Sequence, residues 1–440
     1  METVWNAFPQ PSASQLSWHA LEYYGFIHFT TNTFTDREWG HGDEDPRLFQ
    51  PTDFDADQWA DTARNAGMKG LILTCKHHDG FCLWPSRYTE HSVKHSPWRH
   101  GKGDIVREVS EACERHDLKF GVYLSPWDRN HAEYGRSAYV DYYRRQLQEL
   151  LTEYGPVFEV WFDGANGGDG FYGGSRETRR IDPAGYYGWQ QTWELVRRLQ
   201  PNALCFSDAG PDIRWVGNEA GTASETTWYT LDTKGRFPGY NPPGYDAFHD
   251  LGTGHIKGQQ WVPPEVDVSI RPGWFYHRAE DTQVKGPQDL LDIYFRSVGR
   301  GTNLLLNLPP DRRGLIHEND REALMGFRKL RDSFYAAAAA GRVQPIADKD
   351  LCGLELQFDQ PQSINYLTVQ EDIAEGQRAR RWHVDAWVDG HWCRAAEATS
   401  MGWKRILNFS ATRTDRLRLV VDESDGRPLL RSLSAHSFDV

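Results

Sequence analysis

No stretch of this 440-residue sequence approaches the roughly 18 consecutive apolar residues that a membrane-spanning helix needs. We therefore expect a soluble protein without a membrane partner. The first 20 residues lack the charged-then-apolar layout of a signal peptide, which predicts a cytoplasmic protein or one whose signal was removed. Basic residues are in deficit, since 49 Lys and Arg against 62 Asp and Glu give a formal net charge of −13. This charge argues against a nucleic-acid partner.

Cysteine is also sparse, and its spacing excludes two kinds of site. No CxxC pair occurs, which argues against structural zinc, and no HxH or HExxH spacing suggests a metal enzyme. We expect neither a metal ion nor another cofactor. We interpret the six cysteines as free and mostly buried thiols; they are Cys75, Cys82, Cys113, Cys205, Cys352 and Cys393.

Two further motifs are missing. No GxGxxG follows the first apolar strand, which disfavours a doubly wound nucleotide-binding sheet. No GxSxG elbow is present, which disfavours an α/β-hydrolase. Aromatic residues, by contrast, make up 13% of the chain. Their faces suit the apolar C–H patches of sugar rings, although a large aromatic core explains the same composition.

Apolar strand-like runs alternate with amphipathic helical patterns over the first three quarters of the chain, which predicts an α/β fold with a buried parallel sheet. We expect a (β/α)8-like (TIM) barrel over residues 1–340. The predicted strands are 23–29, 69–75, 119–125, 157–163, 203–209, 266–272 and 303–309. The predicted helices are 55–67, 103–117, 139–155 and 186–201.

The pattern changes near residue 340. Short alternating segments and a hairpin signal at 388–391 predict a C-terminal antiparallel β-sandwich over residues 341–440. This domain could bind carbohydrate or pack against the barrel, and we favour packing for its tryptophans, Trp382, Trp387, Trp392 and Trp403. Two Gly- and Pro-rich stretches, 164–175 and 237–258, follow predicted strands where barrel enzymes build their sites.

Polar and aromatic side chains follow the predicted strands. In a barrel they converge on one rim, at the carboxyl ends of the strands. They include His28, Glu38, Trp39, His77, His78, Tyr123, Trp127, Asp128, Asp163, Asp208, Asp212 and Glu219. His77 and His78 could bind a metal or join a hydrogen-bond network, but we favour contacts with sugar hydroxyls, because imidazole both donates and accepts.

The most informative indication of function is a possible pair of catalytic carboxylates. Glycoside hydrolysis needs two of them, one that stays ionised and one that donates a proton to the leaving group. Asp163 ends an apolar strand beside Gly164 and could be the ionised member or a turn residue. The candidates for its partner are Asp208, Asp212, Glu219 and Glu225.

Six ordered segments give the sequence a family resemblance across residues 18–335. It resembles an α-L-fucosidase of glycoside hydrolase family 29, closest to the branch that acts on α-1,3/1,4-linked fucose of branched, Lewis-type glycans. The segments are FIHFTTNTFTDREWG, LTCKHHDGFCLWPS, GVYLSPWDRN, EVWFDGANG, FSDAGPDIRWVGNEAG and VDVSIRPGWFYH.

The resemblance implies a retaining, exo-acting hydrolase whose partner is a fucosylated oligosaccharide or glycoconjugate. It implies that Asp163 is the nucleophile and that Glu219, in RWxGxE, is the acid/base; Glu225 resembles the acid/base position of a broader-specificity branch. The fucose contacts that it implies are His28, Glu38, Trp39, His77, His78, Tyr123, Trp161 and Trp228. Residues 167–186 look longer than the family's usual segment, so we expect them to reshape the leaving-group side.

Two other functions remain compatible with these residues. The chain could be a non-catalytic glycan-binding protein, or a metal-dependent barrel hydrolase using His77 and His78. Detectable turnover would exclude the first, and activity that is insensitive to chelators would exclude the second.

Overall fold

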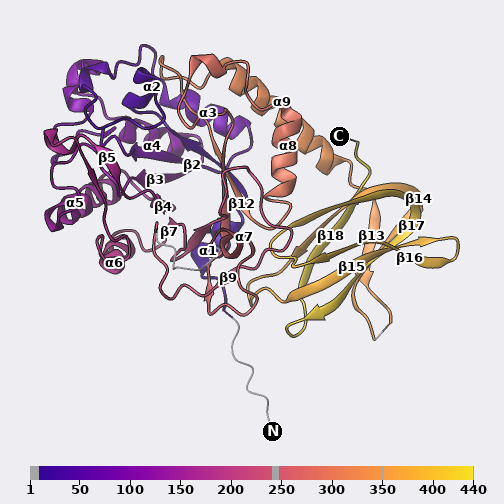
Figure 1. The fold of residues 1–440 in the computed structure, drawn as a ribbon. Helices are drawn as coiled ribbons and strands as arrows, with labels where there is room; N and C mark the ends of the chain where they lie inside the picture. Colours follow the sequence, from indigo (N-terminus) through magenta and orange to yellow (C-terminus); the bar gives the residue numbers. More distant parts are fainter. Residues whose placement is uncertain (1–8, 240–246, 349, 440) are drawn as a thin grey trace, which may run out of the picture.

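The structure is a computed structural model that describes residues 9–239, 247–348 and 350–439. Its first part is a closed barrel of parallel strands (Figure 1), which confirms the predicted TIM-like barrel. Around the barrel the strands follow the order β1-β12-β11-β8-β7-β4-β3-β2. They are β1 (Tyr23–Ile27), β2 (Gly70–Lys76), β3 (Lys119–Leu124), β4 (Glu159–Trp161), β7 (Leu204–Ser207), β8 (Ile213–Trp215), β11 (Pro264–Ser269) and β12 (Asn303–Asn307).

Amphipathic helices connect most of these strands and cover the outside of the barrel. Asp55 caps the first of them by accepting the N–H groups of Asp57 and Gln58, and Asp104 caps the second in the same way. The helices are α3 (Ala56–Asn65), α4 (Ile105–Arg115), α5 (Ser137–Glu153), α6 (Trp189–Leu199), α8 (Pro287–Arg296) and α9 (Glu318–Ala336). The shorter α2 (Thr31–Thr35) and α7 (Ala247–Thr253) lie in loops.

The connection from β7 to β8 departs from the alternating pattern. Only residues 208–212 join the two strands, and they contain no helix. The sequence analysis missed β8 because three residues are too few to show a strand pattern. After β8 the chain enters a long segment that carries β9 (Thr230–Leu231) and β10 (Gln260–Trp261). The predicted Gly- and Pro-rich stretch 237–258 falls here, but its residues 240–246 lie outside the described part of the chain.

The amino-terminal end of the barrel is closed by α1 (Ala13–His19). Trp18 reaches into the barrel, where its indole N–H donates to Tyr24 Oη at 2.7 Å and to Glu159 Oε2 at 3.0 Å. Large aromatic and aliphatic side chains from the strands fill the rest of the interior. With this end plugged, the open carboxyl ends of the strands are left for a site.

The C-terminal part is antiparallel, as predicted for a β-sandwich. It consists of β13 (Gly341–Pro345), β14 (Cys352–Glu371), β15 (Ala379–Val388), β16 (His391–Thr399), β17 (Arg405–Ser424) and β18 (Leu430–His436). The long strands β14 and β17 shift register between Gln357 and Gln362, and both of their halves line one apolar core. The first half of β14 pairs with β13 and the second half of β17 pairs with β15, whereas the second half of β14 pairs with β18.

The sheet packs against the barrel through α8 and α9 (Figure 1). Phe295 and Phe334 from these helices both contact Tyr366 of β14. The tryptophans of the C-terminal part are engaged within the protein: Trp382 is fully buried, and Arg416 and Arg418 lie over Trp387 and Trp392.

Four of the six cysteines are buried, as expected, but Cys352 is exposed and Cys393 is half-buried on the C-terminal sheet. Both sit on strands of a thin sheet with one face toward solvent. Among the described residues, no helix is long and apolar enough to cross a membrane.

Candidate active site

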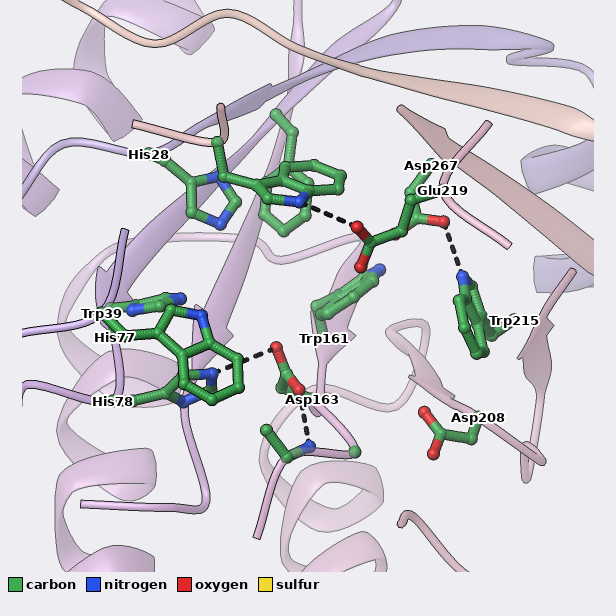
Figure 2. A pocket seen from close by; sticks show the side chains of 14 residues that line it. His28, Trp39, His77, His78, Trp161, Asp163, Asp208, Trp215, Glu219 and Asp267 are labelled. Carbon is green, nitrogen blue, oxygen red and sulfur yellow. Dashed lines mark hydrogen bonds and ion pairs between the residues drawn. The ribbon is translucent and has the colours of Figure 1, made fainter. Parts of the chain in front are cut away.

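A cavity of about 250 Å³ opens at the carboxyl ends of the barrel strands (Figure 2). Six of the eight barrel strands contribute to its wall, directly or through the loops that follow them, so residues far apart in sequence meet here as predicted. The lining consists of Phe26, His28, Trp39, His77, His78, Trp161, Asp163, Gly164, Ala165, Asp208, Trp215, Glu219, Asp267 and Trp274. No cluster of His, Cys, Asp and Glu suited to a metal ion occurs in the part of the chain that the structure describes.

Asp163 lies just beyond β4 and points into this cavity. Tyr123 Oη donates to its Oδ2 at 2.9 Å, and the Ala165 N–H donates to its Oδ1 at 2.7 Å. His78 Nε2 lies 3.8 Å from the same Oδ2. With one hydrogen bond to each oxygen, the carboxylate is fixed in orientation while a quarter of the side chain stays accessible from the cavity.

Gly164 allows a second carboxylate to approach Asp163. A Cβ added at Gly164 would lie 2.2 Å from Asp208 Oδ2, which accepts the Gly239 N–H at 2.9 Å. Burial raises the pKa of Asp208 to about 6, and the nearby charge of Asp163 adds to this. The sequence suggested that Asp163 and Gly164 could form a turn. In the structure, Gly164 also leaves room for Asp208 beside Asp163.

We expect Gly164→Ala to lower kcat/KM by roughly 10–100-fold, because the methyl group must displace either Asp208 or the turn that holds Asp163. The measurement is steady-state hydrolysis of an aryl α-L-fucoside, the type of substrate that the sequence resemblance implies. The matched control is Asp208→Gly, alone and combined with Gly164→Ala. If steric pressure from Asp208 causes the loss, the alanine costs much less in the Asp208→Gly background, and an equal cost in both backgrounds would refute this explanation.

Glu219 comes from the loop that follows β8, and its carboxylate points toward the same cavity as that of Asp163 (Figure 2). The Trp274 indole N–H donates to Glu219 Oε2 at 3.1 Å. Burial raises the pKa of Glu219, the Trp274 hydrogen bond opposes this rise, and the negative charges of Asp163 and Glu38 add to it. Glu219 is therefore placed to hold a proton beside the Asp163 carboxyl group.

The other proposed partners of Asp163 lie elsewhere or are held differently. Glu225 is outside the cavity lining and pairs with Arg300 and with Arg405, the latter at 2.9 Å. Asp212 pairs with Arg197 at 2.7 Å, also outside the lining.

The histidines of the cavity are neutral, since burial lowers the pKa of His28 to about 3 and that of His78 to about 4. Their hydrogen bonds fix the tautomers. Asn307 Nδ2 donates to the Trp274 carbonyl at 2.8 Å, so its Oδ1 faces His28 Nδ1, also at 2.8 Å. His28 Nδ1 must therefore carry the proton, which leaves Nε2 as an acceptor.

The same reasoning applies to His78. The Ser125 hydroxyl donates to the Trp127 carbonyl at 2.6 Å, so its oxygen accepts from His78 Nδ1 at 2.7 Å. His78 Nε2 is then an acceptor, 3.8 Å from the Asp163 carboxylate. Both His28 and His78 thus offer acceptors to a bound molecule that carries hydroxyl groups.

Aromatic rings complete the wall. Trp161 stacks on Phe206 with ring centroids 4.1 Å apart, and its indole N–H donates to Glu265 Oε1 at 2.9 Å beneath the cavity. Trp39 is half exposed at the rim and meets His78 and Trp127 edge-on. Such a mixture of aromatic faces, acceptors and carboxylates suits a sugar ring.

Three of the predicted contact residues lie outside the cavity lining. Glu38 accepts the backbone N–H groups of Trp274 and Phe275, at 2.8 and 3.1 Å, and so holds the loop that presents Trp274. Tyr123 is buried behind Asp163 and acts on it through the hydrogen bond already described. Trp228 is half-buried, and the structure does not bring it to the cavity.

The sequence analysis did not single out Phe26, Trp215, Asp267 or Trp274 as site residues. Trp215 Nε1 donates to Asp267 Oδ1 at 2.7 Å, which joins a half-buried indole to a buried carboxyl group beside Glu219. The segment VDVSIRPGW contained a usable signal, because its polar Asp267 interrupts an apolar strand and Trp274 follows the strand end.

The long segment after Asp163 forms a small hairpin of β5 (Gly168–Gly170) and β6 (Glu177–Arg179). Arg129 joins this hairpin to the Trp39 loop, since its Nε donates to the Asp169 carbonyl at 2.7 Å and its Nη1 donates to the Gly40 carbonyl at 2.7 Å. The hairpin thus borders the rim of the cavity near Trp39.

Comparisons with known proteins identify the family of this chain. The family model for alpha-L-fucosidase matches residues 3–329. The chain is 39% identical to Alpha-L-fucosidase 1 of Arabidopsis thaliana, over 97% of this chain and 87% of that protein. It is 45% identical, with a TM-score of 0.92, to the crystal structure of a glycoside hydrolase 29 family member from an unknown rumen bacterium, over 98% of this chain and 77% of that one.

A second similar structure contains a ligand. A Ruminococcus gnavus GH29 fucosidase in complex with fucose is 27% identical, with a TM-score of 0.84, over 98% of this chain and 95% of that one. The full barrel, the carboxylate-lined cavity and the appended sheet are thus accounted for together: this chain belongs to the α-L-fucosidase family, glycoside hydrolase family 29.

Proposed function

We propose that this protein is a retaining exo-α-L-fucosidase in which Asp163 is the nucleophile and Glu219 the acid/base. Asp163 Oδ2 attacks the anomeric carbon of fucose while the bond to the leaving-group oxygen breaks, and Glu219 gives its proton to that oxygen. A water molecule then gives a proton to Glu219 and attacks the fucosyl-enzyme, which releases fucose with retained configuration and frees Asp163.

The single observation that carries this proposal is the pair of unlike carboxyl groups facing one cavity. Burial and the charge of Asp163 raise the pKa of Glu219, as the proton donor requires. Asp163 is oriented by donors on both oxygens, as an attacking carboxylate requires. Glu225, the alternative acid/base, is paired with two arginines outside the cavity lining, which supports Glu219 instead.

The neutral histidines give the sugar its orientation in this proposal. Nε2 of His28 and Nε2 of His78 each accept a hydrogen bond from a fucose hydroxyl, and His77 lies between them in the wall. Since the pKa values of His28 and His78 are near 3 and 4, these acceptors persist throughout the neutral range. Trp161 offers its face to the sugar ring.

We further propose that the preferred substrate carries α-1,3/1,4-linked fucose on a branched, Lewis-type glycan. Support comes from the RWxGxE segment and from the hairpin 168–179, which adds wall at the rim where a leaving sugar departs. The experiment compares kcat/KM for a Lewis-type trisaccharide and an aryl α-L-fucoside. Preference for the trisaccharide is expected, equal or greater activity on the aryl fucoside contradicts the linkage preference, and no release from either contradicts the enzyme.

The pH dependence tests the proton donor separately. Activity is lost as pH rises through the pKa of Glu219, because only its protonated form can donate. Trp274→Phe removes the hydrogen bond that stabilises the ionised form and therefore raises the pKa of Glu219 further. We expect the alkaline limb of kcat/KM for the trisaccharide to move to higher pH. A limb that stays in place or moves to lower pH would show that Glu219 does not control it.

A further inference from the structure

The loop that carries Glu219 is held from both sides. At its start, the Val216 N–H donates to the Glu265 carbonyl at 3.0 Å, which ties it to β11. At its end, the Ala223 N–H donates to the Arg296 carbonyl at 2.8 Å, which ties it to α8. Asn218 closes the loop internally by accepting the Ala220 N–H and donating to the Thr222 carbonyl. The position of Glu219 therefore depends on how firmly these two ends are fixed.

The C-terminal sheet fixes the chain directly beyond that end. Arg405, the first residue of β17, donates through Nη1 to the Glu225 carbonyl at 2.8 Å and through Nη2 to Glu225 Oε2 at 2.9 Å. Arg300 of the barrel donates to Glu225 Oε1 and, at 2.6 Å, to the Ala223 carbonyl. Glu225 thus joins one arginine from each domain.

Further hydrogen bonds beside Glu225 join the barrel to the C-terminal part. Gln377 accepts the Tyr229 N–H at 3.0 Å and donates to the Thr227 carbonyl at 3.0 Å. The Ser400 hydroxyl accepts the Thr227 N–H at 3.0 Å. Backbone groups of residues 225–229 are consequently bound by side chains of the C-terminal part.

The ion pair between Arg405 and Glu225 matters for stability because the Arg405 side chain is buried. The Arg405 side chain is only 4% exposed, whereas Glu225 is 69% exposed. Burial lowers the pKa of Arg405 and the charge of Arg300 acts in the same direction, while Glu225 opposes both. Without Glu225, two arginines would face each other beside a buried backbone segment, and the loop end would have to move.

We propose that Arg405 and Glu225 are positioning residues for the acid/base: the C-terminal sheet holds the Glu219 loop so that this carboxyl group stays in the cavity wall against Trp274 and aimed at the leaving-group oxygen. This inference rests on the proposed role of Glu219. Glu225, whose position resembles the acid/base position of a broader-specificity branch, would then position Glu219 and would not touch the substrate itself. The Arg405 contact also gives the appended sheet a part in proton donation.

The test compares leaving groups and pH profiles in purified full-length variants. We expect Glu225→Gln to lower kcat/KM for a Lewis-type trisaccharide by about tenfold, but to change kcat/KM for a dinitrophenyl fucoside by less than about twofold, because an activated leaving group needs little proton donation. The alkaline limb should move to lower pH, since a displaced Glu219 is better solvated. Arg405→Met should act in the same way, and Arg405→Lys should retain part of the activity.

The matched control is Lys404→Met. Lys404 also pairs across the two domains, but with Glu22 at the opposite end of the barrel from Glu219. This variant should leave both the leaving-group ratio and the pH limb unchanged, whatever its effect on Tm. The inference is overturned if Lys404→Met reproduces the pattern, or if Glu225→Gln and Arg405→Met lower both substrates equally or neither.

Glu219→Gln in the same assays separates this inference from the proposed function. If Glu219→Gln shows strong leaving-group dependence while the Glu225 and Arg405 variants do not, only the positioning role fails. If Glu219→Gln shows none, the acid/base assignment itself fails. A loss in Glu225→Gln as large as that in Glu219→Gln, with Arg405→Met active on the trisaccharide, would make Glu225 the proton donor and overturn both.

Discussion

Replacing Asp163 with glycine is expected to lower kcat by roughly 10³–10⁵-fold on every fucoside, because the variant lacks the carboxylate that we propose forms the fucosyl-enzyme. The fold should survive. The Asp163 side chain is partly exposed, and its hydrogen bonds involve only Tyr123 and the Ala165 N–H. We therefore expect Tm to stay within about 3 °C of the wild-type value.

Azide gives this variant a sharper readout than loss of activity alone. In Asp163→Gly, azide can occupy the vacated space and attack the anomeric carbon from the face that the carboxylate used. An activated aryl α-L-fucoside should then yield β-fucosyl azide, and turnover should rise with azide concentration. Asp208→Gly is the matched control, because it opens similar space beside Gly164 and should give no such product. Azide rescue of Asp208→Gly alone would transfer the nucleophile role to Asp208.

Glu219→Gln is expected to separate substrates by their leaving groups. For a Lewis-type trisaccharide, kcat/KM should fall by about 10²–10⁴-fold, since the departing sugar oxygen needs a proton. For a dinitrophenyl fucoside the fall should be about tenfold or less, because that leaving group departs as a stable anion. Glutamine keeps an acceptor for the Trp274 indole N–H, so the local structure is retained.

The pH profile of the same variant supplies an independent check. The alkaline limb that Glu219 imposes on trisaccharide hydrolysis should disappear, because the glutamine cannot titrate. An unchanged limb, or equal losses for both substrates, would contradict the assignment. Comparison with Glu225→Gln shows which glutamate donates the proton. Substitution of the proton donor must make kcat/KM depend more strongly on the leaving group than substitution of the other glutamate.

The barrel could be predicted from sequence because its strands are continuous apolar runs and its helices carry strong amphipathic patterns. The strand β8 could not, since Ile213–Trp215 is too short and no helix precedes it. Two of the short alternating segments that the sequence shows beyond residue 341, at 351–358 and 363–369, are two halves of the single strand β14 in the structure. Between these halves the strand changes its pairing partner. The polar residues at this point resemble a turn in the sequence.

The candidate site shows a similar division. Asp163, His28, His77 and His78 could be predicted because each follows an apolar strand, and parallel strands bring such ends together. Glu219 and Glu225 could not be separated by spacing, because six residues of loop can place a side chain on either face. The structure separates them through their partners, Trp274 in the cavity and two arginines outside it. Trp274 itself depends on a loop that Glu38 holds from a distant segment.

The most direct test of the central claim is to trap the covalent intermediate. The wild-type enzyme would be incubated with 2-deoxy-2-fluoro-fucosyl fluoride, whose fluorine slows release of the sugar, and then digested for peptide mass spectrometry. We predict stoichiometric labelling of the peptide that contains Asp163, with fragmentation placing the fluorofucosyl group on that carboxylate. Labelling of Asp208 or Glu219 instead, or turnover of the reagent with inversion and no label, would contradict the account.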